Sequence, residues 1–147
     1  MTEDLIVALN TCIETCMDAE RGYATAAADV RDVELKALFL GYSKERADFV
    51  MALQAAVKKL GAYPENQGSA TGALHHGWVN VRKLVEGRND RAITEECERG
   101  EAHALDRYHA ALKHASLDST PPDIRVMLLE QLEAIESALD LLKRRFA

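Results

Sequence analysis

Apolar residues recur every three or four positions along most of the chain, which is the spacing that places them on one face of an α-helix. The pattern runs through four long segments separated by turn-forming residues. It predicts helices over residues of about 3–30, 33–60, 90–115 and 123–146. Because each predicted helix has one apolar face, each needs neighbours that cover it.

The breaks between these segments carry residues that start and stop helices. Asp32 is a candidate N-cap for the second helix, and Thr120 followed by Pro121 is a candidate start for the last one. Residues 61–69 have the Gly, Pro, Asn and Ser content of a loop. Residues of about 69–86 have an apolar stripe of their own, which predicts a shorter helix lying across the others.

Short links join the first predicted helix to the second and the third to the fourth, whereas about 29 residues separate the second from the third. Short links give antiparallel hairpins, and a long connection sets the second hairpin against the first. This is the connectivity of a ferritin-like antiparallel four-helix bundle. We therefore expect a single all-α domain over residues 1–147, with a long crossover that contains the short extra helix.

Composition agrees with a helical protein and narrows its partners. Of 147 residues, 48% are hydrophobic and only 5% aromatic, and the net charge is −6. A negative chain lacks the field that attracts phosphate backbones, so we expect no nucleic acid partner. No apolar stretch approaches the ~20 residues of a membrane span, and the acidic N-terminus is unlike a signal peptide. We expect a cytoplasmic protein without a membrane partner, and the bundle faces favour a homo-oligomer such as a dimer.

Charged residues interrupt the predicted apolar faces near the middle of the helices. Glu45 and Arg46 hold the stripe position in the second helix. Glu20 lies beside the stripe of the first helix, and Glu98 and Glu101 lie beside that of the third. Burying a carboxylate or a guanidinium is costly unless each charge is paired. These five residues are therefore the main candidates for a central site.

A short motif occurs in both the first and the third predicted helix. Glu20-Arg21-Gly22 recurs as Glu98-Arg99-Gly100 at an offset of 78 residues. The two copies fall at comparable depth in helices that the pseudo-twofold axis of such a bundle relates. The functional interpretation is that two helices each direct one carboxylate to a common site.

A di-iron or di-manganese centre is one function for such carboxylates. In bundles of this type two helices each supply a Glu, and the other two each supply a Glu-x-x-His pair. The second helix offers Glu45 with Asp48, and the last helix offers Glu130 with Glu133 or Glu133 with Glu136. None of these pairs contains a histidine, so the ligand set is incomplete.

Several other side chains are candidates for accessory roles. Tyr23, Tyr42 and Tyr108 are predicted core aromatics whose hydroxyls need partners, which buried Glu and Arg residues could supply. His75 precedes a tryptophan in the crossover and is interpreted as a packing or capping residue, with an accessory role at the site as the alternative.

Three cysteines, at positions 12, 16 and 97, lie on predicted core faces without a Cys-x-x-Cys pair. The spacing suggests neither a disulfide framework nor a zinc site. We interpret them as small buried hydrophobic residues, and a cuprous ion held by soft thiolates is the alternative.

Four segments resemble a known family: Glu20-Arg21-Gly22-Tyr23, residues 42–47, residues 72–78 and Glu96-Cys97-Glu98-Arg99-Gly100-Glu101. They are similar to the bacterial family of stand-alone ferritin-like four-helix-bundle proteins catalogued as a domain of unknown function. The resemblance covers essentially the whole chain. It implies a link to bacterial stress responses and a metal site.

The resemblance also assigns residues to that site. It places Glu20, Glu45, Glu98 and Glu101 in the inward-facing acidic positions. It further implies an imidazole near position 139 of the last helix, where this chain has Leu139. The chain therefore departs from the family's pattern at the nitrogen ligand.

Two functions follow from these patterns. In the first, the four glutamates bind iron or manganese and support ferroxidase or oxygen-activating chemistry. In the second, Arg46 neutralises the same carboxylates without metal, and the protein is a non-catalytic, stress-associated structural or partner-binding protein. We favour the second, because the histidines of the ligand pattern are absent and a two-metal centre would bring its own positive charge.

Overall fold

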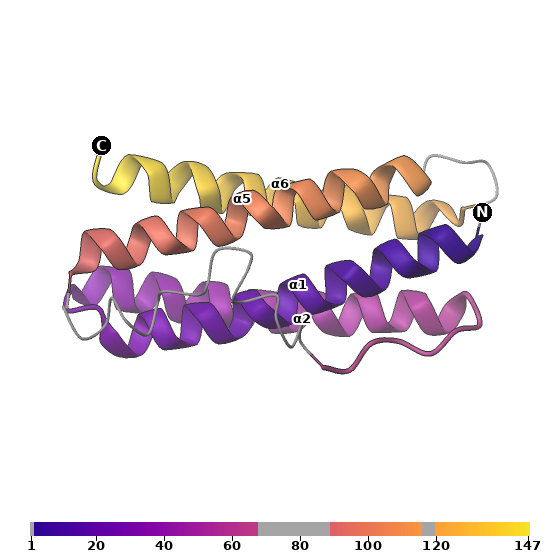
Figure 1. The fold of residues 1–147 in the computed structure, drawn as a ribbon, viewed down its shortest axis with the longest axis horizontal. Helices are drawn as coiled ribbons and strands as arrows, with labels where there is room; N and C mark the ends of the chain where they lie inside the picture. The colour runs from indigo at the N-terminus through magenta and orange to yellow at the C-terminus, as the bar shows by residue number, and fades with distance from the viewer. Residues whose placement is uncertain (1, 68–88, 116–119) are drawn as a thin grey trace.

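The computed structural model describes residues 2–67, 89–115 and 120–147, and Figure 1 shows the arrangement of these parts. Within these ranges the chain forms only helices, with no strand. The helices are α1 (Thr2–Asp29), α2 (Val33–Lys59), α5 (Asp90–His114) and α6 (Pro122–Arg145). The predicted all-α fold with four long helices is confirmed, and each observed end lies within one residue of the predicted one. The helix predicted over 69–86, with His75, lies outside the described residues.

The four helices run along the long axis of the molecule and form a bundle (Figure 1). α1 packs against α2 over most of its length and also against α5, α5 packs against α6, and α2 and α6 meet at few positions. The turn between α1 and α2 and the C-terminus lie at one end of the bundle, and the N-terminus lies at the other (Figure 1). None of the described helices is long and apolar enough to cross a membrane.

Helix starts follow the sequence signals in α2 and differ in α6. The Asp32 carboxylate accepts a 2.9 Å hydrogen bond from the Leu35 N–H, so the predicted N-cap is confirmed. In α6 the first helical residue is Pro122, and Pro121 is the N-cap without any side-chain hydrogen bond. The prediction that Thr120 caps this helix is wrong. The N-cap position falls on Pro121, whose side chain has no hydrogen-bond acceptor, and Thr120 lies one residue before it.

Side chains and backbone also tie the helices together at the end of the bundle that holds the α1–α2 turn. The two carboxylate oxygens of Asp90, the first residue of α5, accept hydrogen bonds from the N–H groups of Arg31 and Asp32 at 2.9 and 3.0 Å. Arg145 near the end of α6 donates to Asp32 at 3.1 Å. Two carboxylates and one arginine therefore hold α5 and α6 to the turn between α1 and α2.

The apolar core is divided into two clusters. One contains Leu9, Leu53 and Leu128, and it fills the half of the bundle near the N-terminus. The other contains Phe39 and Leu142, and it fills the half near the α1–α2 turn. Charged side chains are buried at the level where the two clusters meet, as the interruption of the apolar faces predicts.

Candidate functional site

A buried ion pair between α2 and α5 is the centre of the site. The Nη1 and Nη2 atoms of Arg46 donate to Oε1 and Oε2 of Glu101 at 2.5 and 2.6 Å. Both residues have 0% of their surface exposed. A guanidinium and a carboxylate that share two parallel hydrogen bonds form the strongest common type of protein ion pair. The charge on each side chain is therefore compensated directly by the other.

Tyr23 brings α1 into the same group. Its hydroxyl donates to Oε2 of Glu101 at 2.7 Å. The Arg46 guanidinium carbon lies 5.7 Å from the centroid of the Tyr23 ring and 5.6 Å from that of Phe49, within the range of cation–π attraction. We call Tyr23, Arg46 and Glu101 the charged cluster. It joins three helices through one carboxylate.

The surroundings fix the protonation of two members of the charged cluster. Burial lowers the pKa of Arg46, but the charge and hydrogen bonds of Glu101, with smaller effects of Tyr23 and Cys16, together outweigh it, so the pKa lies above its ordinary value and the side chain stays a cation. Burial raises the pKa of Tyr23, and the negative charge of Glu101 raises it further. Tyr23 is thus a permanent hydrogen-bond donor and Arg46 a permanent charge. Neither has the pKa near neutrality that a general acid or base needs.

Glu45 and Tyr42 lie at the edge of the charged cluster. Oε1 of Glu45 is 3.5 Å from Nε of Arg46, and the Glu45 side chain is 36% exposed. This separation is too long for a good hydrogen bond, so the pair is a weaker electrostatic contact. The Tyr42 ring lies 5.2 Å from that of Tyr23, and burial followed by the charge of Glu101 raises its pKa.

The other two predicted glutamates do not join this group. Glu20 is partly exposed, and its backbone carbonyl accepts a 2.8 Å hydrogen bond from Ser43. Glu98 is also partly exposed; burial and then Glu95 raise its pKa, and Lys143 lowers it. The structure therefore brings Glu45, Arg46 and Glu101 together and leaves Glu20 and Glu98 outside.

The repeated motif has a different consequence from the one expected. Its two glycines, Gly22 and Gly100, are both buried. The residues that follow the two copies are Tyr23 and Glu101, which hydrogen-bond each other. α1 and α5, which carry the two copies, run antiparallel. Two copies of a motif on antiparallel helices can therefore lie side by side at only one level along the bundle. The motif marks the level at which α1 and α5 meet, and the contact there is a tyrosine on a carboxylate instead of two carboxylates.

A second polar group, the neutral cluster, is buried on the N-terminal side of the first. It consists of Cys16 on α1, Tyr108 on α5 and Gln131 on α6. The Tyr108 hydroxyl donates to Oε1 of Gln131 at 2.6 Å and lies 3.2 Å from the Cys16 sulfur. Because a hydroxyl has one hydrogen, the Cys16 thiol is the donor in the second contact. This cluster joins α1, α5 and α6.

Gln131 was not among the residues predicted for a site. It lies three residues after Leu128 and four before Ile135, on the apolar stripe of α6, and it is 4% exposed. A neutral amide on an apolar stripe is the signal that would have found it. Glu96 was also not predicted; it lies three residues after Ile93, is fully buried and is paired with Arg99.

The three cysteines are buried and free. Burial raises the pKa of Cys16 to about 11, and it raises those of Cys12 and Cys97 as well. Since the thiolate is the nucleophile and the metal ligand, these thiols are unreactive at neutral pH. Their environment agrees with a packing role.

The donor set does not fit a carboxylate-bridged pair of metal ions. Such a centre needs free carboxylate oxygens from several helices and imidazole nitrogens. Both oxygens of Glu101 already accept hydrogen bonds from Arg46, and one also accepts from Tyr23. A guanidinium therefore lies against the carboxylate that a metal would need. Among the described residues, no three or more His, Cys, Asp or Glu side chains are grouped so as to hold a metal ion.

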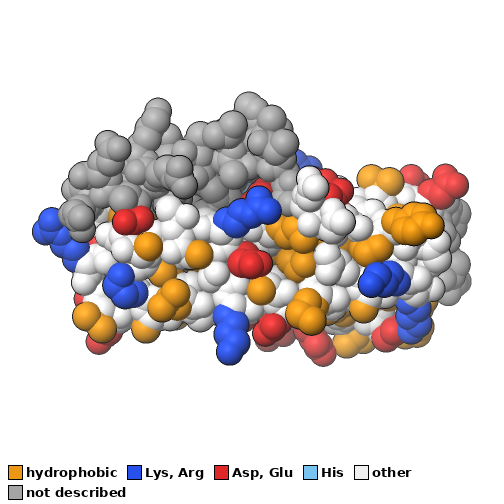
Figure 2. Space-filling model, turned by 90° about the horizontal axis from the view of Figure 1, so that it is seen from below, with side chains coloured by type: hydrophobic (Ala, Val, Ile, Leu, Met, Phe, Trp, Pro, Cys, Tyr) orange, Lys and Arg blue, Asp and Glu red, His pale blue; other side chains and the backbone are white. Residues whose placement is uncertain are grey.

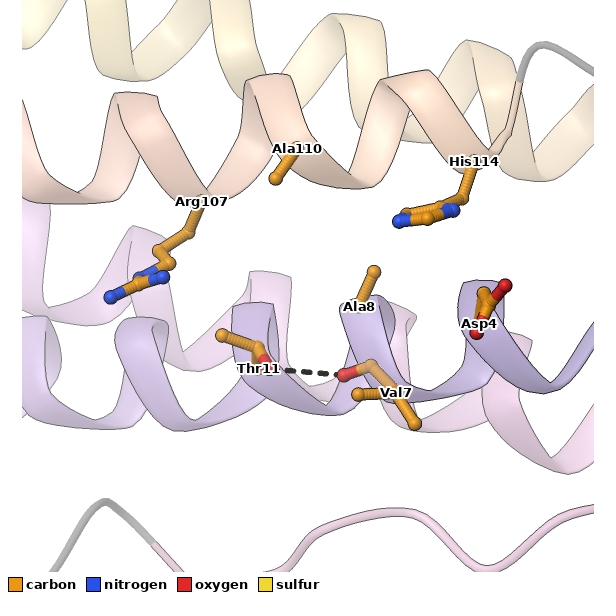
Figure 3. A pocket seen from close by; sticks show the side chains of 7 residues that line it. All are labelled: Asp4, Val7, Ala8, Thr11, Arg107, Ala110 and His114. Carbon is orange, nitrogen blue, oxygen red and sulfur yellow. Dashed lines mark hydrogen bonds between the residues drawn. The ribbon is translucent and has the colours of Figure 1, made fainter.

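A pocket of about 250 Å³ lies between α1 and α5 near the N-terminal end of the bundle (Figure 3). Arg107 and His114 stand at its opposite ends, and the small side chains of Ala8 and Ala110 lie between them (Figure 3). The Nε of Arg107 donates to His103 at 3.2 Å, outside the pocket lining. None of the residues of the charged cluster lines this pocket, so the buried ion pair has no opening through it.

Comparison with known proteins places most of the chain in one family. Residues 4–114 match the family described as Domain of unknown function (DUF2383). No curated protein matches the chain in sequence. The matched region contains α1 from residue 4 onwards, α2 and α5, and therefore the whole charged cluster. It ends at the last residue of α5, so Gln131 of the neutral cluster lies outside it.

Proposed function

The chain belongs to the DUF2383 family, whose description names no activity, and from the site itself we propose that it is a non-catalytic structural and partner-binding protein. In this proposal the protein is a ferritin-like bundle in which Arg46 fills the role that a metal ion has in a metal-binding bundle. The link to the bacterial stress response stays a prediction from the resemblance.

The observation that supports this proposal is the bidentate pair between Arg46 and Glu101. In a two-metal bundle, metal ions supply the positive charge that holds carboxylates from different helices together. Here a side chain of α2 supplies that charge to a carboxylate of α5. A guanidinium is not deprotonated in a protein and has no redox chemistry. Because it is part of the chain, it also cannot dissociate into solvent as a bound metal ion can. The connection between the helices is therefore permanent.

The cluster has the properties of a structural element. It is fully buried, and Tyr23 and Arg46 keep one protonation state near neutral pH. A group that changes neither its charge nor its exposure performs no acid–base step. Buried ionic groups of this kind can specify how helices align, because a shifted register leaves a charge without its partner. We assign this role to the charged cluster.

The ferritin-like class is part of the same proposal. Two helical hairpins, α1 with α2 and α5 with α6, are separated by residues 60–89, and α1 packs against α5. This order of contacts is what a bundle with one long crossover between its second and third long helices requires.

The proposal is tested by measuring metal content and thermal stability together. Protein purified without chelators is analysed for iron and manganese, and its melting temperature is measured with chelator and with either ion added. We expect no stoichiometric metal and no change in melting temperature. Retention of about one or two ions per chain, with a melting temperature that falls on chelation, would instead support a metal-binding protein.

Arg46→Leu provides the matched variant for this experiment. If Arg46 supplies the compensating charge, the variant is destabilised and added iron or manganese does not restore its stability. Arg125→Leu is the control, because Arg125 is exposed on α6 and far along the chain from the charged cluster. Recovery of Arg46→Leu on adding metal would show that the carboxylates form a metal site once the guanidinium is removed.

A further inference from the structure

The outer face of α2 has apolar and charged residues in an ordered arrangement. Three of its hydrophobic side chains are strongly exposed: Val33 at 78%, Leu40 at 55% and Met51 at 69%. Viewed from the side of α1 and α2, hydrophobic side chains stand between acidic and basic ones (Figure 2). The exposed positions of α2 are 33, 34, 37, 40, 41, 44, 48, 51, 52, 55, 58 and 59. We call these positions the α2 face.

The α2 face is complementary to itself when it is reversed. Suppose that a second copy of α2 packs antiparallel to the first, with the two-fold axis at the level of Arg46 along the helix. Each residue then lies at the level of the residue of the second copy for which the two residue numbers add up to 92. Lys44 then lies opposite Asp48 of the second copy, and Glu34 lies opposite Lys58 of the second copy. Each pair occurs twice in a two-fold interface, so opposite charges meet at four places.

Large and small residues on the α2 face also match under this operation. Met51 lies opposite Gly41 of the second copy. A Cβ placed on Gly41 would have no atom within 4 Å, so the space above this glycine is open. The exposed Met51 side chain therefore has a small residue to receive it in each copy. This is the arrangement by which the side chains of one helix fill the grooves of another.

The geometry of α2 allows the whole face to take part. The helix has 27 residues, which corresponds to a length of about 40 Å. Helices that cross at about 20° stay in contact over several turns, and small residues on the facing sides allow close approach. Towards the ends, Ala37 lies opposite Ala55 of the second copy. Val33 lies opposite Lys59, whose Nζ is held by Asp123 at 2.6 Å.

We propose that the partner of this protein is a second copy of itself, bound through the α2 face in an antiparallel, two-fold arrangement. This inference specifies the partner-binding part of the proposed function and rests on it, but it does not depend on the charged cluster. An isologous interface requires that a surface fit its own reverse. The α2 face meets this requirement in its charges and in the match between Met51 and Gly41. A different protein as partner would have no need of that symmetry.

The test is the molar mass in solution, measured by sedimentation equilibrium over a range of concentrations. The wild-type chain is expected at twice its mass of 16.3 kDa. Lys44→Glu places like charges opposite each other at two places and should raise the dissociation constant at least about tenfold. Lys44→Glu combined with Asp48→Lys restores opposite charges, and the constant should return to within about threefold of the wild type.

Arg125→Glu is the control for a charge reversal on another exposed face, and it should leave the mass unchanged. A wild-type chain that stays monomeric up to roughly 100 μM would overturn the proposal. So would a dimer that Lys44→Glu does not weaken or that the exchanged pair does not restore. A monomer with metal-independent stability would refute the interface while leaving the role of Arg46 and Glu101 intact.

Crosslinking tests the orientation. A chain with Ala37→Cys and Ala55→Cys should form a disulfide-linked dimer, because these positions face each other across the interface. Either single variant should not, since each residue lies about 27 Å along the helix from its own copy. The native cysteines are buried and do not interfere. Efficient self-crosslinking of Ala37→Cys alone would contradict the antiparallel arrangement.

Discussion

The charged and neutral clusters lie two helical turns apart in the same bundle, yet they hold it together differently. In both, a tyrosine reaches across between α1 and α5 and a third helix completes the group. In the charged cluster the third helix is α2, and its contribution is an ion. In the neutral cluster the third helix is α6, and its contribution is an amide.

The difference shows what a buried charge adds to a helical core. A neutral hydrogen bond contributes about 1 kcal/mol, and its loss leaves one unsatisfied group. An ion pair contributes little more net stability, because removing both charges from water is costly. Removing one partner, however, leaves the other charge buried and unpaired. A misaligned α2 would therefore cost the charged cluster much more free energy than a misaligned α6 would cost the neutral cluster.

Removing the guanidinium should have the largest effect. Arg46→Leu leaves the Glu101 carboxylate buried without its cation, and we expect a loss of about 3–5 kcal/mol in the free energy of unfolding. Urea denaturation at neutral pH measures it. The control Arg125→Leu, on an exposed position of α6, should stay within about 0.5 kcal/mol of the wild type. A loss below about 1 kcal/mol for Arg46→Leu would contradict the proposed difference between the charged and neutral clusters.

Removing the amide of the neutral cluster should cost less. Gln131→Leu takes the acceptor from the Tyr108 hydroxyl, and the expected loss is about 1–2 kcal/mol. The same denaturation experiment measures it, with the exposed neighbour Glu130→Gln as control. If Gln131→Leu destabilised the protein as much as Arg46→Leu, the distinction between the two clusters would be lost.

The thiol in the neutral cluster reports on its burial. With its pKa raised to about 11, Cys16 should not react with an alkylating reagent at pH 8 in the folded protein, and it should react once urea unfolds the chain. Mass spectrometry of the labelled protein distinguishes Cys16 from Cys12 and Cys97. Rapid labelling of Cys16 in the native state would show that the cluster opens to solvent.

The smallest effect concerns the surface carboxylate at the α1–α2 turn. The hydrogen bond from the Leu35 N–H, with help from Arg145, lowers the pKa of Asp32 below its ordinary value of 3.8. Its contribution to stability is therefore complete above about pH 3.8 and is lost as the pH falls through the lowered pKa. Asp32→Asn keeps a capping side chain, so its melting temperature should depend less on pH below pH 4 than that of the wild type. Parallel pH profiles for the two proteins would contradict this assignment.

The fold could be predicted from the sequence because the apolar residues keep the helical period along each long segment, with only a few charged residues at stripe positions. Arg46 could be identified because a charge on an apolar stripe has few explanations. Its partner could not be identified, since Glu20, Glu98 and Glu101 all lie near the stripes of their helices. Only the alignment of α1, α2 and α5 selects Glu101, and that alignment depends on packing between helices.

The contacts of the tyrosines show the same limit. The sequence predicts that Tyr23 and Tyr108 need hydrogen-bond partners, and the structure provides Glu101 for one and Gln131 for the other. Nothing in the local pattern distinguishes an anionic acceptor from an amide. The helix that faces each hydroxyl decides it, and this is a property of the assembled bundle.

A double-mutant cycle in the presence of chelator tests whether Arg46 and Glu101 stabilise the bundle as a pair without metal. The free energies of unfolding are measured for Arg46→Leu, Glu101→Leu and the double variant. We predict that the double variant loses less stability than the two single variants together, by about 2–3 kcal/mol, because it leaves no unpaired charge. Additivity within about 0.5 kcal/mol would contradict the claim.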